Sequence, residues 1–265
     1  MNISVNGITM AYSASGEGQP LVFVHGYPLN RGIWQPQLDE LAGVARVLAP
    51  DLRGHGQSQP VAGPYSMDLF ADDLAGFLDA LGVVEPVILC GLSMGGYAAF
   101  AFFRRYPERL KGLVLTATRA SADTPQGKTN RDLAAESARQ NGVGAIAEKM
   151  LPLILAPETI EKNPELFESV REIMQSTSLE GILGDLIALK ERPDSTPDLA
   201  HINLPTLVVH GEQDQIIPYQ EAHAMHDAIP GSLWELISAA GHLPCLENPA
   251  AYNQALRSFV QALGG

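Results

Sequence analysis

One stretch of the chain, Val87-Ile-Leu-Cys-Gly-Leu-Ser-Met-Gly-Gly-Tyr97, constrains the fold more than any other. The apolar residues before its glycines predict a buried strand, and the small and apolar residues after them predict a helix. Gly-x-Ser-x-Gly between a strand and a helix is typical of a nucleophile elbow, in which Gly91 and Gly95 leave room for a strained turn. We therefore predict that Ser93 is a nucleophile at a helix N-terminus, where free backbone N–H groups and the helix dipole stabilise an oxyanion.

The segments around this elbow indicate the fold class. A hairpin is predicted over residues 3–12, and apolar runs at 21–24, 44–49 and 110–115 alternate with helical patterns, one of which begins after Ser66. These runs are continuously apolar, which is typical of parallel strands covered by helices on both faces. We therefore predict an α/β fold built on a mostly parallel sheet.

The alternation stops at about Arg119 and resumes after His201. A capping box of Thr177 and Glu180 is predicted at one helix start within this region. We predict that residues 119–201 form a helical cap over the carboxyl ends of the strands, where open α/β sheets bind ligands. The core domain would then comprise residues 1–118 and 202–265. The four helical segments predicted in the cap are 129–150, 152–162, 164–176 and 178–191.

Composition narrows the class of partner. The formal net charge is −13, which argues against nucleic acid and against anionic membrane surfaces. Cys90 and Cys245 are far apart and form neither a disulfide framework nor a metal-ligand spacing. The first residues lack the basic and apolar regions of a signal peptide, and no apolar run is long enough to span a membrane. We expect a cytoplasmic protein that acts on a small molecule, as a monomer or a homo-oligomer.

A serine hydroxyl needs a general base, and the base needs an orienting carboxylate. Among the histidines, only His242 follows a glycine after the last predicted strand. Asp214 is preferred to Glu212 as the carboxylate because it lies further into the turn and precedes Ile216-Ile217-Pro218. The order nucleophile, acid, histidine is that of a known hydrolase arrangement. We predict a triad of Ser93, Asp214 and His242 that uses no metal and no cofactor.

An oxyanion hole needs two backbone N–H groups. We expect one from Met94 and the other from the loop His25-Gly26-Tyr27-Pro28, in which Tyr27 is the donor because Pro28 has no N–H. Asp51 is expected to brace its own loop through backbone hydrogen bonds. The remaining histidines are expected to be structural at strand ends (His25, His210), in loops (His55, His201) or on a helix surface (His223, His226).

The substrate pocket is expected to be apolar and bounded by the cap. Apolar side chains on the predicted cap helices and near the triad are its candidate lining residues. They are Tyr27, Leu29, Leu151, Ile154, Met174, Leu183, Ile187, Ile216 and Leu243.

With these pieces in place, the chain resembles the α/β-hydrolase family over nearly its whole length. The matching segments are His25-Gly26, Asp51-Leu-Arg-Gly-His-Gly-Gln-Ser58, Gly91-Leu-Ser-Met-Gly95, Gly211-Glu-Gln-Asp214 and Gly241-His242. The resemblance implies an eight-stranded, mostly parallel sheet with an antiparallel strand near its start. It also implies a helical cap between the sixth and seventh strands.

The resemblance also limits the reaction. Ser93 argues against the haloalkane dehalogenases and epoxide hydrolases of the family, which carry Asp at the nucleophile position. The segment His25-Gly-Tyr-Pro-Leu29 resembles the loop of cofactor-free bacterial esterases with perhydrolase side activity. The expected function is therefore hydrolysis of small carboxylic esters through an acyl-enzyme intermediate, with perhydrolysis as the implied side activity.

Two alternatives stay open. The segments Ala122–Gly127 and Glu191–Pro197 resemble 3-oxoadipate enol-lactonases, whose substrate carries a carboxylate. Such a pocket would hold a cation, for which Arg119, Arg131 and Arg192 are candidates, with solvated surface as the other interpretation. Those lactonases typically lack the His-Gly pair that this chain has at residues 25 and 26. The third reading is a non-catalytic receptor for a small ligand, because the same fold also serves as a binding module.

Overall fold

A computed structural model describes residues 1–264 of the chain. Its eight-stranded sheet has the order β1-β2-β4-β3-β5-β6-β7-β8. The pairs β1–β2 and β2–β4 are antiparallel, and every other neighbouring pair is parallel. The predicted eight-stranded, mostly parallel sheet is thereby confirmed. Its strands are β1 Asn2–Val5, β2 Ile8–Ser15, β3 Pro20–Val24, β4 Arg46–Pro50, β5 Val87–Leu92, β6 Leu110–Thr116, β7 Thr206–Gly211 and β8 Leu233–Ile237.

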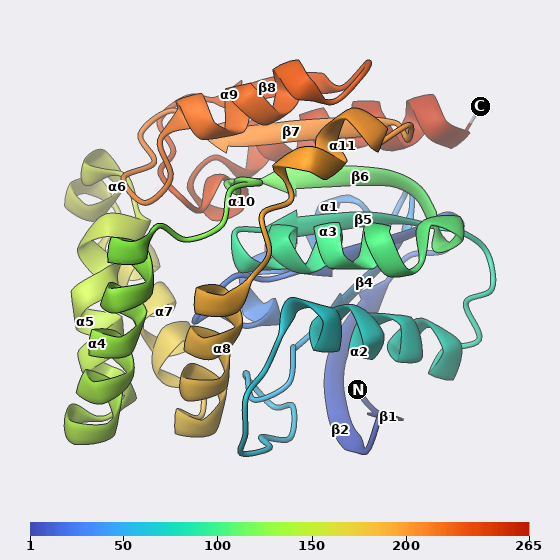
Figure 1. Cartoon of the computed structure of the whole chain (residues 1–265). Coiled ribbons are helices and arrows are strands. Elements are labelled where there is room, and N and C mark those ends of the chain that lie inside the picture. Colours follow the sequence, from blue (N-terminus) through green and yellow to red (C-terminus); the bar gives the residue numbers. More distant parts are fainter. Residues whose placement is uncertain (265) are drawn as a thin grey trace.

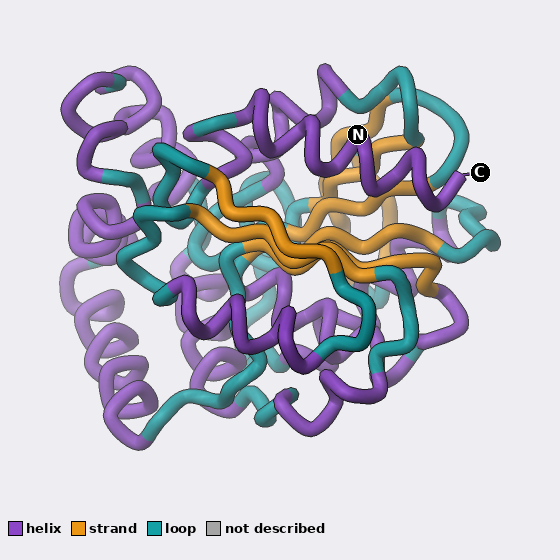
Figure 2. Tube along the Cα trace, turned by 90° about the horizontal axis from the view of Figure 1, so that it is seen from above, coloured by secondary structure: helices purple, strands orange, loops and turns teal. Residues whose placement is uncertain are grey.

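Helices cover both faces of the sheet (Figure 2). Successive side chains of a strand point to opposite faces, so along β3 Val22 and Val24 join one hydrophobic cluster while Leu21 and Phe23 join the other. The first cluster contains the apolar faces of α2 (Met67–Ala80) and α3 (Met94–Arg105), and the second contains that of α11 (Pro249–Gly264). Burial on both faces explains why the parallel strands are continuously apolar.

The helix starts follow local capping rules. Ser66 accepts a hydrogen bond from the backbone N–H of Leu69 at 3.0 Å and caps α2, as predicted. After β3 the chain forms a 3₁₀ turn, Arg31–Trp34, followed by α1, Gln35–Glu40. No helix within residues 1–264 is both long and apolar enough to cross a membrane. The remaining elements outside the five cap helices are 3₁₀ helices Pro107–Arg109 and Thr196–His201, and helices α9 Tyr219–Ala228 and α10 Pro244–Glu247.

Five α-helices lie between β6 and β7 in the chain and gather beyond one end of the sheet (Figure 1). Four were predicted; the prediction was wrong because Gly142, with φ of +78°, ends a helix there and because Pro152 lies within a helix. The division into a core and a cap of residues 119–201 stays a prediction. The five helices are α4 Pro125–Asn141, α5 Val143–Ile154, α6 Pro157–Lys162, α7 Pro164–Gln175 and α8 Leu179–Glu191.

The start of α8 is fixed against the sheet loops. Ser178, and not the predicted Thr177, caps α8 by accepting from the N–H of Gly181 at 2.9 Å. Thr177 donates its hydroxyl to the carbonyl of Pro28 at 2.8 Å instead. A side chain on Gly181 would come within 2.4 Å of the carbonyl oxygen of Gly54, so only glycine permits this approach.

A buried ion pair adds to this contact. His55 Nε2 lies 2.8 Å from Asp185 Oδ2 on α8, and neither side chain is exposed. Burial alone would lower the pKa of His55, but the charge and hydrogen bond of Asp185, together with the Arg53 carbonyl and the charge of Asp51, outweigh burial and raise this pKa. The sequence indicated only a loop position for His55. Its partner lies far away in the chain, where no local pattern could have revealed it.

Candidate active site

Ser93 occupies a strained turn between β5 and α3. Its φ of +53° is uncommon for a residue with a side chain. A Cβ on Gly91 would lie 2.3 Å from the carbonyl oxygen of Gly95, and a Cβ on Gly95 would lie 2.2 Å from that of Val24. Thr118 donates its hydroxyl to the Ser93 carbonyl at 2.8 Å and helps to hold the turn. The two glycines therefore make the turn possible, as the motif predicted.

Asp214 and His242 meet at the neighbouring strand ends. His242 Nδ1 lies 2.7 Å from Asp214 Oδ2, and both side chains are buried. The other carboxylate oxygen accepts from the N–H groups of Ile216 and Ile217 at 2.8 and 3.0 Å. Burial would raise the pKa of Asp214, but His242 and the backbone donors outweigh it and lower that pKa. Glu212, the alternative carboxylate, is exposed.

A second histidine lies behind Asp214. His210 Nε2 donates to the carbonyl of Ile217 at 2.9 Å and stands 3.4 Å from Asp214 Oδ2. Burial lowers the pKa of His210 despite the nearby carboxylate, so the ring is neutral near pH 7. His210 therefore packs against Asp214 and helps to shape its turn, in line with its predicted structural role.

Glu247 on α10 holds the loop that carries His242. Its Oε1 accepts from the N–H groups of Gly241 and Leu243, at 2.8 and 3.2 Å, on either side of the histidine. Its Oε2 accepts from the N–H of Ala156 and the hydroxyl of Thr159, both at 2.7 Å. One carboxylate thus ties the histidine loop to Ala156, the residue before α6, and to Thr159 within α6. Sequence reasoning missed Glu247, because nothing local distinguishes it from a surface glutamate.

Two backbone N–H groups are free beside Ser93. The N–H groups of Met94 and Tyr27 have no acceptor within residues 1–264. Met94 is the first residue of α3, so its N–H is unused by the helix. Tyr27 follows β3, the strand next to β5 in the sheet. Both positions are those expected for an oxyanion hole.

Asp51 and His25, which were predicted to be structural, are buried and form hydrogen bonds between neighbouring loops. Asp51 accepts from the N–H groups of Arg31 and Gln57 at 2.8 and 2.9 Å and forms an ion pair with Arg31. His25 accepts from the N–H of Leu52 through Nε2 at 2.9 Å. These contacts join the loops after β3 and β4 next to Tyr27.

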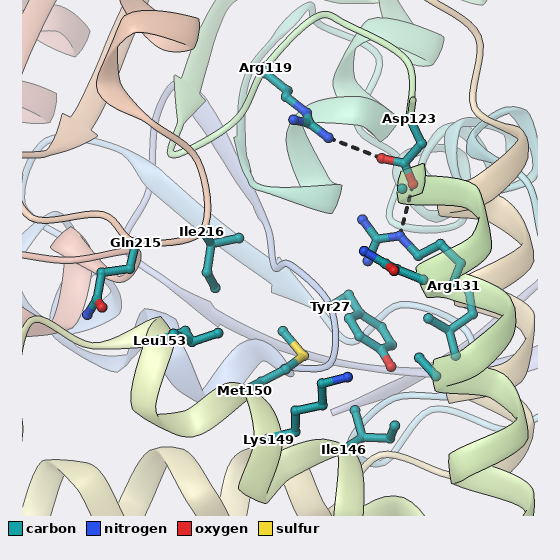
Figure 3. A pocket seen from close by; sticks show the side chains of 14 residues that line it. Tyr27, Arg119, Asp123, Arg131, Ile146, Lys149, Met150, Leu153, Gln215 and Ile216 are labelled. Carbon is teal, nitrogen blue, oxygen red and sulfur yellow. Dashed lines mark hydrogen bonds and ion pairs between the residues drawn. The ribbon is translucent and has the colours of Figure 1, made fainter. Parts of the chain in front are cut away.

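A cavity opens in front of Ser93 in two adjoining compartments. The inner one has a volume of about 90 Å³ and reaches both Ser93 and His242. The outer one has a volume of about 470 Å³ and is shown in Figure 3. The residues that line both compartments, and so form the neck between them, are Tyr27, Arg119, Arg131, Met150 and Ile216.

The predicted pocket residues divide into two groups. Tyr27 and Ile216 line the cavity. Within residues 1–264, the other seven line neither compartment: Ile187 is exposed, and the rest pack into or against the hydrophobic clusters. Leu151, Ile154 and Met174 do so because the apolar stripes of α5 and α7 face one another. Those seven are Leu29, Leu151, Ile154, Met174, Leu183, Ile187 and Leu243.

Other side chains, which sequence reasoning missed, line the cavity instead. Met150 precedes the predicted Leu151 on α5, and one residue turns the helix face by about 100°. Tyr97 on α3 and Leu189 on α8 also line the inner compartment. Of the candidate cations, Arg119 and Arg131 line both compartments, while Arg192 lines neither and is buried.

The structure contains no group of three His, Cys, Asp or Glu side chains in residues 1–264 that could hold a metal ion. Cys90 and Cys245 are both buried as free thiols. Burial raises the pKa of Cys90 to about 12, so this thiol stays protonated and unreactive. The expectation that the site needs no cofactor stays a prediction.

Comparisons with known proteins agree with this arrangement. A family model described as alpha/beta hydrolase fold matches residues 19–249. A thermophilic esterase from Thermogutta terrifontis, solved with malate bound, is 42% identical with a TM-score of 0.97, and the match covers 100% of this chain and 99% of that one. 3-Oxoadipate enol-lactonase 2 from Acinetobacter baylyi is 28% identical over 98% of this chain and 96% of its own length. A non-heme chloroperoxidase from Kitasatospora aureofaciens is 32% identical over 80% of each.

Proposed function

This chain belongs to the α/β-hydrolase family, and from that premise we propose that it is a serine hydrolase that cleaves small carboxylic esters through an acyl-enzyme intermediate. One observation carries the proposal. Ser93, in its strained turn, shares a chamber of about 90 Å³ with His242, whose other ring nitrogen is hydrogen-bonded to the buried Asp214. A nucleophile, a base and an orienting carboxylate are the parts that acyl transfer needs.

The proposed reaction begins when the Ser93 hydroxyl attacks the ester carbonyl carbon and His242 Nε2 takes its proton. The negative charge that develops on the carbonyl oxygen is stabilised by the N–H groups of Tyr27 and Met94. Asp214, ionised and bound to Nδ1–H, stabilises the imidazolium. His242 then gives its proton to the departing alcohol, and a water molecule activated by the same histidine hydrolyses the acyl-enzyme.

Ester hydrolysis is preferred to lactone hydrolysis because the Thermogutta esterase matches the whole chain at 42% identity, whereas the Acinetobacter lactonase matches at 28%. Lactonase activity is the second candidate, supported by that relative. The similarity to a chloroperoxidase supports perhydrolysis as a side activity. The free donors and the buried Asp214–His242 pair weigh against a purely binding role.

A substrate panel tests this proposal. Purified protein is assayed with short-chain alkyl esters, simple lactones and thioesters at pH 8, with the Ser93→Ala variant as the control. We expect the highest kcat/KM on a short-chain ester and a fall to near background in Ser93→Ala, since the triad acts as a unit. Turnover of lactones alone would support the second candidate. Equal rates for both proteins would remove Ser93 from the mechanism.

A further inference from the structure

The cavity beside Ser93 is positively charged, although the chain as a whole has a net charge of −13. Its outer compartment is lined by three cationic side chains, Arg119, Arg131 and Lys149, and by one carboxylate, Asp123. Cations spread over the surface of an acidic protein would need no explanation. Their concentration in the cavity next to the nucleophile indicates a ligand of negative charge.

Asp123 cannot neutralise the arginines around it. Its carboxylate meets Arg119 at 3.1 Å, Arg131 at 3.0 Å and Arg192 at 2.8 Å. Arg192 is buried and also donates to the carbonyls of Leu189 and Ser121, so its role is structural, and its single charge balances that of Asp123. Two positive charges remain at the neck of the cavity.

Burial would raise the pKa of Asp123, but the hydrogen bonds and charges of Arg131 and Arg192 outweigh it and lower that pKa. Asp123 therefore stays ionised and keeps the arginines in place. Within residues 1–264, neither Arg119 nor Arg131 has another ion-pair partner, and the buried Nε of Arg119 has no acceptor.

Arg131 presents two free guanidinium nitrogens at the cavity that it lines. It binds Asp123 through Nε, which leaves both terminal nitrogens without a partner in the described part of the chain. Figure 3 shows Arg119, Asp123 and Arg131 along one side of the cavity, with Met150, Leu153 and Ile216 across from them. Two parallel N–H donors of a guanidinium match the two oxygens of a carboxylate.

The hydroxyl of Tyr27 is a further unpartnered donor in the lining of the same cavity. This oxygen is buried and has no hydrogen-bond partner within residues 1–264, although Tyr27 lines both compartments. Burial, followed by the charge of Asp185, raises the pKa of Tyr27, so the phenol remains protonated and donates. An unpartnered buried donor in a cavity lined by cations favours an acceptor that carries negative charge.

We infer that Arg131 and Arg119, held by Asp123, form a carboxylate-binding subsite, with the Tyr27 hydroxyl as a further donor in the same cavity, and that the preferred substrates are esters or lactones bearing a carboxylate a few carbon atoms from the reacting carbonyl. This inference rests on the proposed hydrolase function. The position of the subsite supports it, because these residues form the neck that a substrate reaching Ser93 must occupy. The apolar side chains opposite the arginines would contact the part of the substrate that joins its reacting carbonyl to its carboxylate.

Two matched esters test the subsite. Ethyl butyrate and monoethyl succinate have the same reacting carbonyl, the same leaving group and the same acyl length, and differ only in a terminal methyl or carboxylate. Their kcat/KM values are measured by pH-stat titration. In the wild type we expect the succinate ester to be preferred. In Arg131→Gln we expect the succinate-to-butyrate ratio to fall about 10- to 100-fold, as for loss of a charge-assisted hydrogen bond.

Arg139→Gln is the control, since it makes the same change on the same helix about 12 Å further along, where Arg139 pairs with Glu136 at the surface. It should leave the ratio unchanged. Arg131→Lys should keep part of the preference, and Tyr27→Phe should lower the ratio by a few-fold. An unchanged ratio in Arg131→Gln, with both esters slowed equally, would show that Arg131 only ties α4 to the loop after β6 and would overturn the subsite.

Binding of succinate alone separates this inference from the proposed function. Succinate should raise the Tm of the wild type and of Ser93→Ala, but not that of Arg131→Gln, relative to butyrate at equal ionic strength. A Tm shift without turnover of either ester would support the subsite and contradict the hydrolase proposal. Turnover of both esters with no succinate effect would contradict the subsite alone.

Discussion

At the scale of single residues, Asp214 shows how the environment fixes a charge. The carboxylate is out of contact with water, which would favour its neutral form, yet three hydrogen bonds from His242 and two backbone N–H groups hold it ionised. Its lowered pKa means that Asp214 carries its charge at every pH at which the proposed reaction runs.

Asp214→Asn keeps the shape of the side chain but removes the charge that orients His242 and stabilises the imidazolium. We expect kcat to fall about 10³- to 10⁴-fold, by analogy with the same change in other Ser-His-Asp enzymes. Glu212→Gln, an exposed carboxylate two residues away, should change kcat less than about twofold. The reverse order in steady-state assays would identify Glu212 as the acid.

The lowered pKa of Asp214 also predicts how the unfolding free energy changes with pH. A carboxylate whose pKa is lower in the folded state stabilises the fold above its unfolded value of about 3.9, and this contribution disappears as the pH falls through the folded value. The difference in unfolding free energy between the wild type and Asp214→Asn should therefore be constant near neutral pH and shrink below about pH 4. A difference that grows with acid would contradict the assignment.

At the scale of elements, the loop after β8 depends on α10 and on the chain between α5 and α6. Glu247 accepts four hydrogen bonds that join these segments around His242. The N–H of His242 itself donates to the carbonyl of Ile154 at the end of α5, at 3.1 Å. The position of the proposed base is therefore tied to the helices over the cavity.

Glu247→Gln tests this tie. In the glutamine, an NH₂ group replaces one of the two carboxylate oxygens, each of which accepts two hydrogen bonds. The NH₂ group would then face two donors, so two of the four hydrogen bonds should be lost. We expect the unfolding free energy to fall by about 2–4 kcal/mol. We also expect kcat to fall at least about tenfold, because a misplacement of about 1 Å costs on the order of 10²-fold.

Glu161→Gln on α6 is the matched control for that change, because Glu161 is exposed. It should alter neither the urea midpoint nor kcat. If Glu247→Gln lowered stability while kcat stayed at the wild-type value, Glu247 would be a structural residue with no part in placing His242.

At the scale of the whole molecule, the sequence predicted the parts that depend on local rules. The elbow glycines, the cap residue Ser66 and the apolar strands each follow from steric or burial constraints within a few residues. The mostly parallel sheet was therefore predicted from the residues, and its eight strands from the family resemblance. The order of nucleophile, acid and histidine also led to three side chains that the fold brings to one edge of the sheet.

The parts that were missed depend on contacts between distant segments. Asp185 meets His55, and Glu247 meets Ala156, across long stretches of chain. Most of the predicted pocket residues line neither compartment of the cavity. On α5, the packing against α7 decides which face is buried, and a rotation by one residue exchanges Leu151 for Met150. Net charge did not indicate the cationic cavity, because a sum over the chain hides where the charges lie; Arg119 and Arg131 became candidates only through the resemblance to enol-lactonases.

The central claim is that Ser93 is the nucleophile that becomes acylated, and covalent labelling tests it most directly. The protein is treated with a serine-directed phosphonate, digested and mapped by mass spectrometry while residual esterase activity is followed. The account predicts one adduct per chain, on Ser93, formed in step with the loss of activity, and no adduct in Ser93→Ala. Stoichiometric loss of activity with the adduct on another residue and Ser93 unmodified would contradict it.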